Sequence, residues 1–146
     1  MRSLRLKKNY AKKNVPSRSL KRKEFILSHI VTIETKVHDP LAVNAACQRL
    51  GLTTPLEGTV ELFSGSATGL IVQLPGWQYP AVIDTLTGKV RYDNFDGAWG
   101  DEAQLNRFLQ AYAVEKVKLE SRKKGYTVNE HALQDGSIKL QVIESA

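Results

Sequence analysis

The chain has 146 residues, of which 42% are hydrophobic and 25% are charged, and its formal net charge is +6. This is the composition of a globular protein long enough to bury a core as one domain. No apolar run approaches the roughly 20 residues that span a bilayer, so we do not expect a transmembrane protein. The first residues lack the apolar segment of a secretory signal, so we do not expect a signal peptide.

The positive charge is concentrated at the start of the chain. Residues 1–24 contain ten Lys and Arg against one Glu, a net charge of +9, whereas residues 25–146 contain 11 basic and 14 acidic side chains, a net charge of −3. Like charges repel, and few apolar residues are available to offset the entropy of ordering. We therefore expect residues 1–26 to be a disordered basic head and residues 27–146 to be a single domain.

The domain begins with a strand and a helix. Apolar and polar residues alternate over residues 31–37, which predicts a half-buried strand. Asp39 suits the N-cap of a helix over residues 40–50, Pro40 suits its first position, and Gly51 suits its end. One apolar stripe runs along this helix, and it includes the single cysteine, Cys47, which has no disulfide partner and fits a reducing cytoplasm.

Alternation returns between residues 57 and 94. It predicts strands over residues 58–63, 69–74, 80–85 and 89–93, and the short connections between them favour antiparallel pairing. A long helix follows over residues 101–124, with Asp101 as its cap and Gly125 after its end. Strands over residues 126–131 and 137–143 close the chain, and Asp135-Gly136 between them is typical of a hairpin turn.

This order of elements predicts an α+β fold. An antiparallel sheet with the short and the long helix packed on one face would bury every apolar stripe, which makes a two-layer sandwich. The pattern leaves the strand order open, so ferredoxin-like and helix-grip arrangements both remain.

Five segments resemble a bacterial family known as domain of unknown function 1257, whose plastid relatives are the hypothetical chloroplast reading frame 35 proteins. The resemblance covers residues 28 to 143, and it implies a small cytoplasmic domain with no established activity, cofactor or catalytic residues. It also implies a protein partner of the AAA-type ATPase class. The segments are Ser-His-Ile-Val-Thr-Ile-Glu-Thr-Lys-Val from residue 28, Phe-Ser-Gly from 63, Trp-Gly-Asp from 99, Phe-Leu-Gln-Ala-Tyr-Ala from 108 and Asp-Gly-Ser-Ile from 135.

The chain departs from this family at its start. Members of the family begin Met-Ser-His, whereas the matching residues here are Leu27, Ser28 and His29. Since bacteria can initiate at codons that are otherwise read as leucine, one hypothesis is that residues 1–26 come from a misplaced start. The alternatives are a genuine solvated tail, an RNA-binding arm and a targeting peptide.

The sequence gives little support for a catalytic or a metal-binding site. His29, His38, His131 and Cys47 lack the spacing of zinc ligands, and no serine lies in a nucleophile pattern. The acidic run over residues 93–102 suggests calcium, but it departs from the EF-hand template and better fits a turn that caps the long helix. We expect no catalytic residue, no cofactor and no metal site, and we lean toward a chain that is not an enzyme.

Aromatic residues are the remaining indication of function. Five of them lie near loops, where they could anchor a partner or could close the open end of the sandwich. We expect them to be the partner-binding candidates: Trp77, Tyr79, Tyr92, Phe95 and Trp99.

Three functions follow from these observations. The first is a non-catalytic protein-binding or adaptor module in the cytoplasm, without contact to a membrane. The second is an enzyme or small-ligand carrier with a pocket between the sheet and the long helix, lined by Tyr112, Glu115 or Asp93. The third is nucleic-acid binding by the cations of the head, Lys7, Lys8, Lys12, Lys13, Lys21, Arg22 and Lys23.

Overall fold

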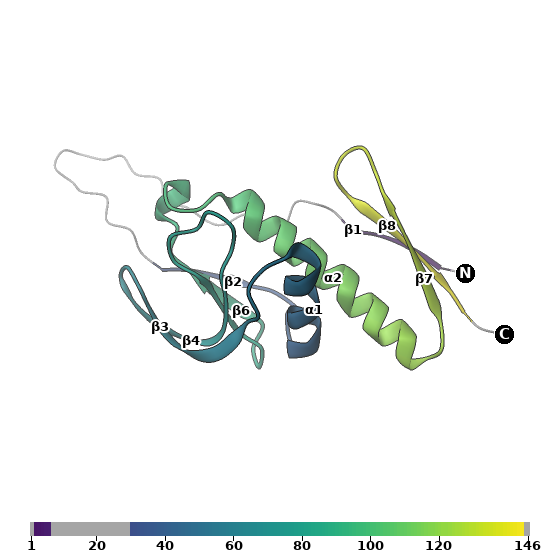
Figure 1. Ribbon diagram of the computed structural model, residues 1–146, viewed down its shortest axis with the longest axis horizontal. Coiled ribbons are helices and arrows are strands. Elements are labelled where there is room, and N and C mark those ends of the chain that lie inside the picture. The colour runs from purple at the N-terminus through teal and green to yellow at the C-terminus, as the bar shows by residue number, and fades with distance from the viewer. Residues whose placement is uncertain (1, 7–29, 145–146) are drawn as a thin grey trace.

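The computed structural model describes residues 2–6 and 30–144, which form two antiparallel sheets and two α-helices (Figure 1). The predicted α+β class is confirmed. The larger sheet has the order β2-β6-β5-β4-β3, and the smaller one has the order β1-β8-β7. The strands are β1 (Arg2–Leu6), β2 (Val31–Glu34), β3 (Leu56–Leu62), β4 (Gly65–Val72), β5 (Ala81–Asp84), β6 (Lys89–Tyr92), β7 (Thr127–Ala132) and β8 (Ile138–Ile143).

Helix α1 (Pro40–Leu50) has the predicted bounds and caps. The Asp39 carboxylate accepts a hydrogen bond from the backbone N–H of Leu41 at 2.9 Å, which satisfies one of the open donors of the first turn. At the other end Gly51 has a φ of +71°, a conformation that costs glycine no steric strain. Both boundaries therefore follow from local residue chemistry.

Helix α2 (Glu102–Lys123) is one residue shorter at each end than predicted. Asp101 is its N-cap, as expected, and accepts from the N–H of Ala103 at 3.0 Å. The acidic run before α2 therefore ends in a helix cap. None of the helices in residues 2–6 and 30–144 has both the length and the apolar character that crossing a bilayer requires.

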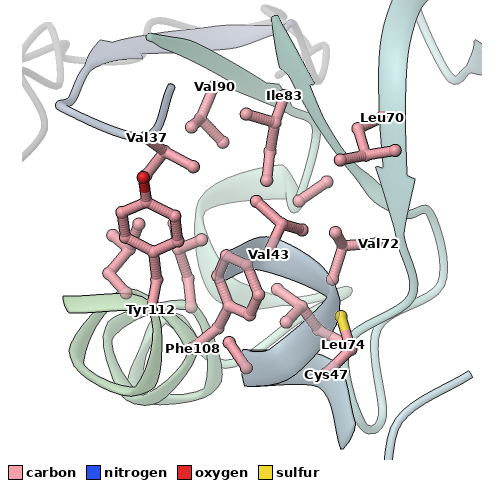
Figure 2. Packing of buried hydrophobic residues seen from close by; sticks show 14 of the residues in the cluster. Val37, Val43, Cys47, Leu70, Val72, Leu74, Ile83, Val90, Phe108 and Tyr112 are labelled. Atoms are coloured by element: carbon pink, nitrogen blue, oxygen red, sulfur yellow. The ribbon is translucent and has the colours of Figure 1, made fainter. Parts of the chain in front are cut away.

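The main core lies between α1, α2 and one face of the larger sheet, as the two-layer prediction required (Figure 2). Side chains from β4, β5 and β6 meet side chains from both helices there. Because these strands and both helices contribute their apolar side chains, the core is continuous across the two layers. Its members include Val37, Val43, Cys47, Leu70, Val72, Leu74, Ile83, Val90, Phe108 and Tyr112.

The hairpin that joins β3 and β4 is tighter than predicted. Its turn consists of Phe63 and Ser64 alone, because Leu62 already pairs with Gly65. Strand β4 therefore begins four residues earlier than the alternation indicated. Residues 65–68, which the predicted strand bounds left in the connection, belong to this strand.

The last two strands do not join the larger sheet, which corrects the prediction of one sheet. They form the smaller sheet, which packs against α2. The reason lies in α2, where Val114 follows Leu105 by nine residues and therefore lies on the opposite side at roughly 100° per residue. Val114 is fully buried together with Leu140 and Val142 of β8. The helix thus has two apolar sides, and Figure 1 shows it running between the two sheets.

The expected disorder of the head does not hold for its first residues. Strand β1 pairs with β8 in an antiparallel register that runs from Arg2 opposite Val142 to Leu6 opposite Ile138. The expectation of disorder rested on composition, which describes side chains only. The pairing of β1 with β8 instead satisfies open backbone N–H and C=O groups along the outer edge of β8. The rest of the head, residues 7–26, lies outside the described residues.

Candidate partner-binding surface

Three loops bring three aromatic rings together around a fourth, that of Trp99. Phe63 comes from the turn between β3 and β4, Tyr79 from the segment before β5, and Phe95 from the connection between β6 and α2. Their ring centroids lie 5.1, 5.6 and 4.8 Å from that of Trp99, distances typical of aromatic pairs. We call Phe63, Tyr79, Phe95 and Trp99 the Trp99 cluster.

The Trp99 cluster reaches the surface of the domain. The side chain of Phe63 is 52% exposed, and Tyr79, Phe95 and Trp99 are half-buried. Rings that already pack against one another lose little conformational entropy when a partner covers them. The cluster therefore has the accessibility and the rigidity of a binding surface.

The backbone beneath the Trp99 cluster is held in an unusual conformation. Phe95 and Asp96 have φ angles of +48° and +54°, and they are the only residues other than glycine with positive φ in residues 2–6 and 30–144. Gly97 follows with a φ of +102°. The left-handed region costs about 1 kcal/mol or more for each residue that carries a β-carbon. Such strain is concentrated at functional sites in proteins.

Asn94 stabilises this left-handed turn. It is buried, and its side-chain Nδ2 donates to the carbonyl of Gly100 at 3.0 Å. Its own carbonyl accepts from the N–H groups of Gly97 and Trp99 at 3.0 and 2.9 Å. Trp99 in turn accepts from the N–H of Gln78 at 2.8 Å. These bonds fix the turn that presents Phe95 and Trp99.

A buried carboxylate links this turn to the β3–β4 hairpin. Asp93, fully buried, accepts from both the backbone N–H and the hydroxyl of Ser64 at 3.2 Å. Ser64 directly follows Phe63, so the bonds set the position of the Phe63 ring beside Trp99. Two acids of the run over residues 93–102 thus have structural roles, since Asp93 binds Ser64 and Asp101 caps α2.

Trp77 and Tyr92 do not belong to the surface. They are 5% and 0% exposed, and their rings contact each other in the main core at 5.5 Å. The Trp77 indole Nε1 donates to the carbonyl of Asp101 at 3.0 Å, and a β-carbon on Gly100 would overlap the indole ring. Burial raises the pKa of Tyr92, and the charge of Glu102 adds to the rise. These two aromatics are therefore part of the main core and are not exposed to a partner.

The three residues proposed to line a ligand pocket are buried or bonded to other side chains. Tyr112 is buried, Glu115 forms an ion pair with Arg49 at 3.1 Å, and Asp93 binds Ser64. Depressions of about 480, 220 and 220 Å³ in the described part of the chain are lined by side chains other than Tyr112, Glu115 and Asp93. The pocket hypothesis therefore has no support from these three side chains.

The metal-ligand candidates are dispersed. His38 and His131 are exposed on different elements, and Cys47 is buried in the main core, where desolvation raises the pKa of its thiol to about 11. No group of three His, Cys, Asp or Glu side chains in residues 2–6 and 30–144 is placed to hold a metal ion. His29 lies outside the described residues, as do the seven head cations proposed for nucleic-acid binding.

We compared the chain with protein-family models, curated proteins and solved structures, and nothing matched. The resemblance to the domain of unknown function 1257 family therefore stays a prediction.

Phe63 is the member of the site that the sequence did not indicate. It appeared as the last residue of a strand, where the alternation gave no reason to single it out. An aromatic residue directly before Ser64-Gly65, a pair typical of turns, is the signal that would have found it.

Proposed function

We propose that this chain is a non-catalytic module that binds a protein partner through the Trp99 cluster. The observation that carries the proposal is the contact of three aromatic rings with Trp99, above a turn that is held in the left-handed conformation. Aromatic side chains contribute much of the binding free energy at protein interfaces. The strained residues Phe95 and Asp96 lie outside the main core, which suggests that the position of Phe95 and Trp99 matters for binding.

Capture of the partner from native cells tests this proposal. Phe63→Asp places a charge on the exposed ring position of the cluster, whereas Leu86→Asp makes the same kind of change at a residue that is 90% exposed in the β5–β6 turn. Both positions are in turns, so both variants should fold. Full-length tagged wild type and the Leu86→Asp variant should recover the same partner, and Phe63→Asp should lose at least about 90% of it.

Quantitative mass spectrometry of the captured material gives the comparison. Equal recovery by Phe63→Asp and wild type would place the interface elsewhere. Failure of the wild type to retain any protein above a tag-only control would contradict a binding function.

A further inference from the structure

Strand β3 is a free edge of the larger sheet. It pairs with β4 on one side, and no described residue pairs with it on the other. It has seven residues, whereas β2 at the opposite edge has four. Large apolar side chains stand at both ends of β3, since Leu56 is 69% exposed and Phe63 is 52% exposed. An edge with these features is a template for an added strand.

The hairpin register shows which backbone groups of β3 face outward. Because the two-residue turn makes Leu62 and Gly65 a hydrogen-bonded pair, the alternation of antiparallel pairs leaves Glu57, Thr59 and Glu61 in non-hydrogen-bonded positions. The hydroxyls of Thr59 and Thr68 lie 2.7 Å apart, which fits the closer side-chain approach of such a pair. The N–H and C=O groups of Glu57, Thr59 and Glu61 therefore point to the open edge.

The same alternation sorts the side chains of β3 into two rows. Glu57, Thr59 and Glu61 are all exposed on one face. Val60 and Leu62 face the other way, where they pack with Val82 and with Tyr79 of the Trp99 cluster. An added strand would thus meet acidic side chains on one face and apolar side chains on the other.

The charges select the occupant of this edge. A second copy that paired antiparallel about Thr59 would place Glu57 opposite Glu61, and like charges directly opposite destabilise a pair of strands. Neither glutamate forms an ion pair with another described residue. A strand with lysine or arginine at the matching positions would instead place opposite charges across the edge.

We propose that an extended basic segment of the protein partner adds to β3 as a sixth strand of the larger sheet and ends against Phe63. This proposal rests on the proposed function, since it names the chemistry of the partner that the Trp99 cluster binds. Basic residues face Glu57 and Glu61, apolar residues alternate with them beside Val60, and a large apolar residue reaches the Trp99 cluster.

A synthetic peptide tests strand addition on the full-length protein. The probe is acetyl-Phe-Lys-Val-Thr-Val-Lys-Phe-amide with a fluorescent label, and it reads the same in both directions, so either strand orientation can form. Its anisotropy should show binding to the wild type. The matched probe with glutamate in place of both lysines should bind at least about tenfold more weakly.

Two variants at one position separate backbone pairing from side-chain contact. Thr59→Pro removes an N–H that faces the open edge and leaves the bonds to β4 intact, a place where strands tolerate proline. It should weaken binding of the lysine peptide at least about tenfold. Thr59→Val also loses the hydroxyl but keeps the N–H, and it should bind within about twofold of the wild type.

The charge pattern has its own test. The double variant Glu57→Lys with Glu61→Lys should prefer the glutamate peptide over the lysine peptide. A peptide methylated at its three central backbone nitrogens removes edge hydrogen bonds without any change to the protein, and it should not bind the wild type. This peptide keeps the test valid even where Thr59→Pro fails to fold.

Several results would overturn strand addition: equal affinity of Thr59→Pro and wild type, equal binding of both peptides, or undiminished binding of the methylated peptide. A homodimer that Thr59→Pro dissociates would assign the edge to a second copy and would also overturn it. Partner capture that depends on Phe63 but is unchanged by Thr59→Pro would refute strand addition and leave the proposed function standing. Partner capture that is unchanged by Phe63→Asp and also by Thr59→Pro would refute both strand addition and the proposed function.

Discussion

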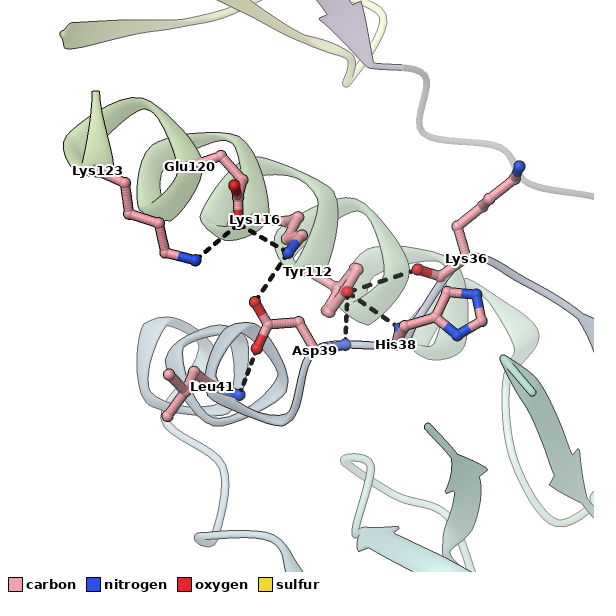
Figure 3. Close-up of polar contacts among 8 residues, drawn as sticks. All are labelled: Lys36, His38, Asp39, Leu41, Tyr112, Lys116, Glu120 and Lys123. Carbon is pink, nitrogen blue, oxygen red and sulfur yellow. Dashed lines mark hydrogen bonds and ion pairs between the residues drawn. The ribbon is translucent and has the colours of Figure 1, made fainter. Parts of the chain in front are cut away.

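The hydroxyl group of Tyr112 on α2 binds the segment that leads into α1 (Figure 3). The oxygen accepts from the backbone N–H groups of His38 and Asp39 at 3.2 and 3.1 Å. The Asp39 carboxylate caps α1 and also accepts from Lys116 of α2 at 2.9 Å. Burial opposes ionisation of Asp39, but its bonds with Lys116 and Leu41 lower its pKa overall. Asp39 thus caps the start of α1 and, through its bond with Lys116, also ties that start to α2.

We expect Tyr112→Phe to lower the free energy of unfolding by about 1–2 kcal/mol, because the N–H of Asp39 loses its acceptor and the N–H of His38 keeps only the carbonyl of Lys36. Urea unfolding followed by circular dichroism measures the change. Tyr126→Phe is the matched control, since no hydrogen bond of the Tyr126 hydroxyl occurs among the described residues, and it should change the value by less than about 0.5 kcal/mol. A loss for Tyr112→Phe no larger than for the control would show that the hydroxyl does not hold the junction.

The sequence indicated Tyr112 as a candidate lining of a pocket, whereas the structure buries its ring in the main core. The sequence could not predict the partners of the hydroxyl, because His38 and Asp39 precede Tyr112 by 74 and 73 residues. The same limit applies to the Trp99 cluster. Loop-end positions identified Tyr79, Phe95 and Trp99, but only the packing of distant turns separates them from Trp77 and Tyr92.

At the scale of elements, ion pairs connect α1, α2 and β7. Arg49 of α1 donates two hydrogen bonds to the Glu130 carboxylate of β7, at 2.7 and 3.0 Å, and a third to Glu115 of α2 at 3.1 Å. Lys118 adds a bond to Glu130 at 2.9 Å. Hydrogen bonds from Arg49 are the main cause that lowers the pKa of Glu130 to about 2. The smaller sheet is thereby attached to both helices.

Because the pKa of Glu130 is lower in the folded state than its ordinary value of 4.5, its contribution to stability is present above pH 4.5. That contribution is lost as the pH falls from about 4.5 to about 2. Glu130→Gln should lower the free energy of unfolding by about 1 kcal/mol at pH 7, since solvent screens a pair that is about a quarter exposed.

Urea unfolding of both proteins at pH 7 and at several values below 4.5 measures this prediction. The difference between wild type and Glu130→Gln should shrink as the pH falls. The same change at the exposed Glu61 should leave the stability within about 0.5 kcal/mol of the wild type. A difference for Glu130→Gln that stays constant down to pH 3 would contradict the assigned ion pairs.

Both helices were predicted nearly to the residue because their boundaries depend on neighbours in the sequence, such as Asp39 and Gly51 for α1. The strands were predicted in number and in direction within the body of the chain. The division into two sheets was not, because the prediction placed all the strands in one sheet with both helices on one face, whereas Val114 on the other side of α2 is buried with β8. Which side of a helix a hairpin covers depends on packing partners that alternation does not specify.

At the scale of the whole molecule, α2 is the element that both sheets share. Its first half contributes Leu105, Phe108 and Tyr112 to the main core, and Val114 faces the smaller sheet. Strand β1 completes that smaller sheet, so residues 2–6 take part in the fold. Strand β3 is an edge of the larger sheet, and the turn that follows it carries Phe63 of the Trp99 cluster.

The central claim is that a protein partner covers the Trp99 cluster, and site-specific photocrosslinking in native cells tests it most directly. A photoreactive phenylalanine at position 63 reports contact at the cluster, and the same group at position 86, equally a turn position with an exposed side chain, is the control. We expect a discrete crosslinked partner from position 63 and none from position 86. Crosslinks of the same yield at both positions, or none at position 63, would contradict the claim.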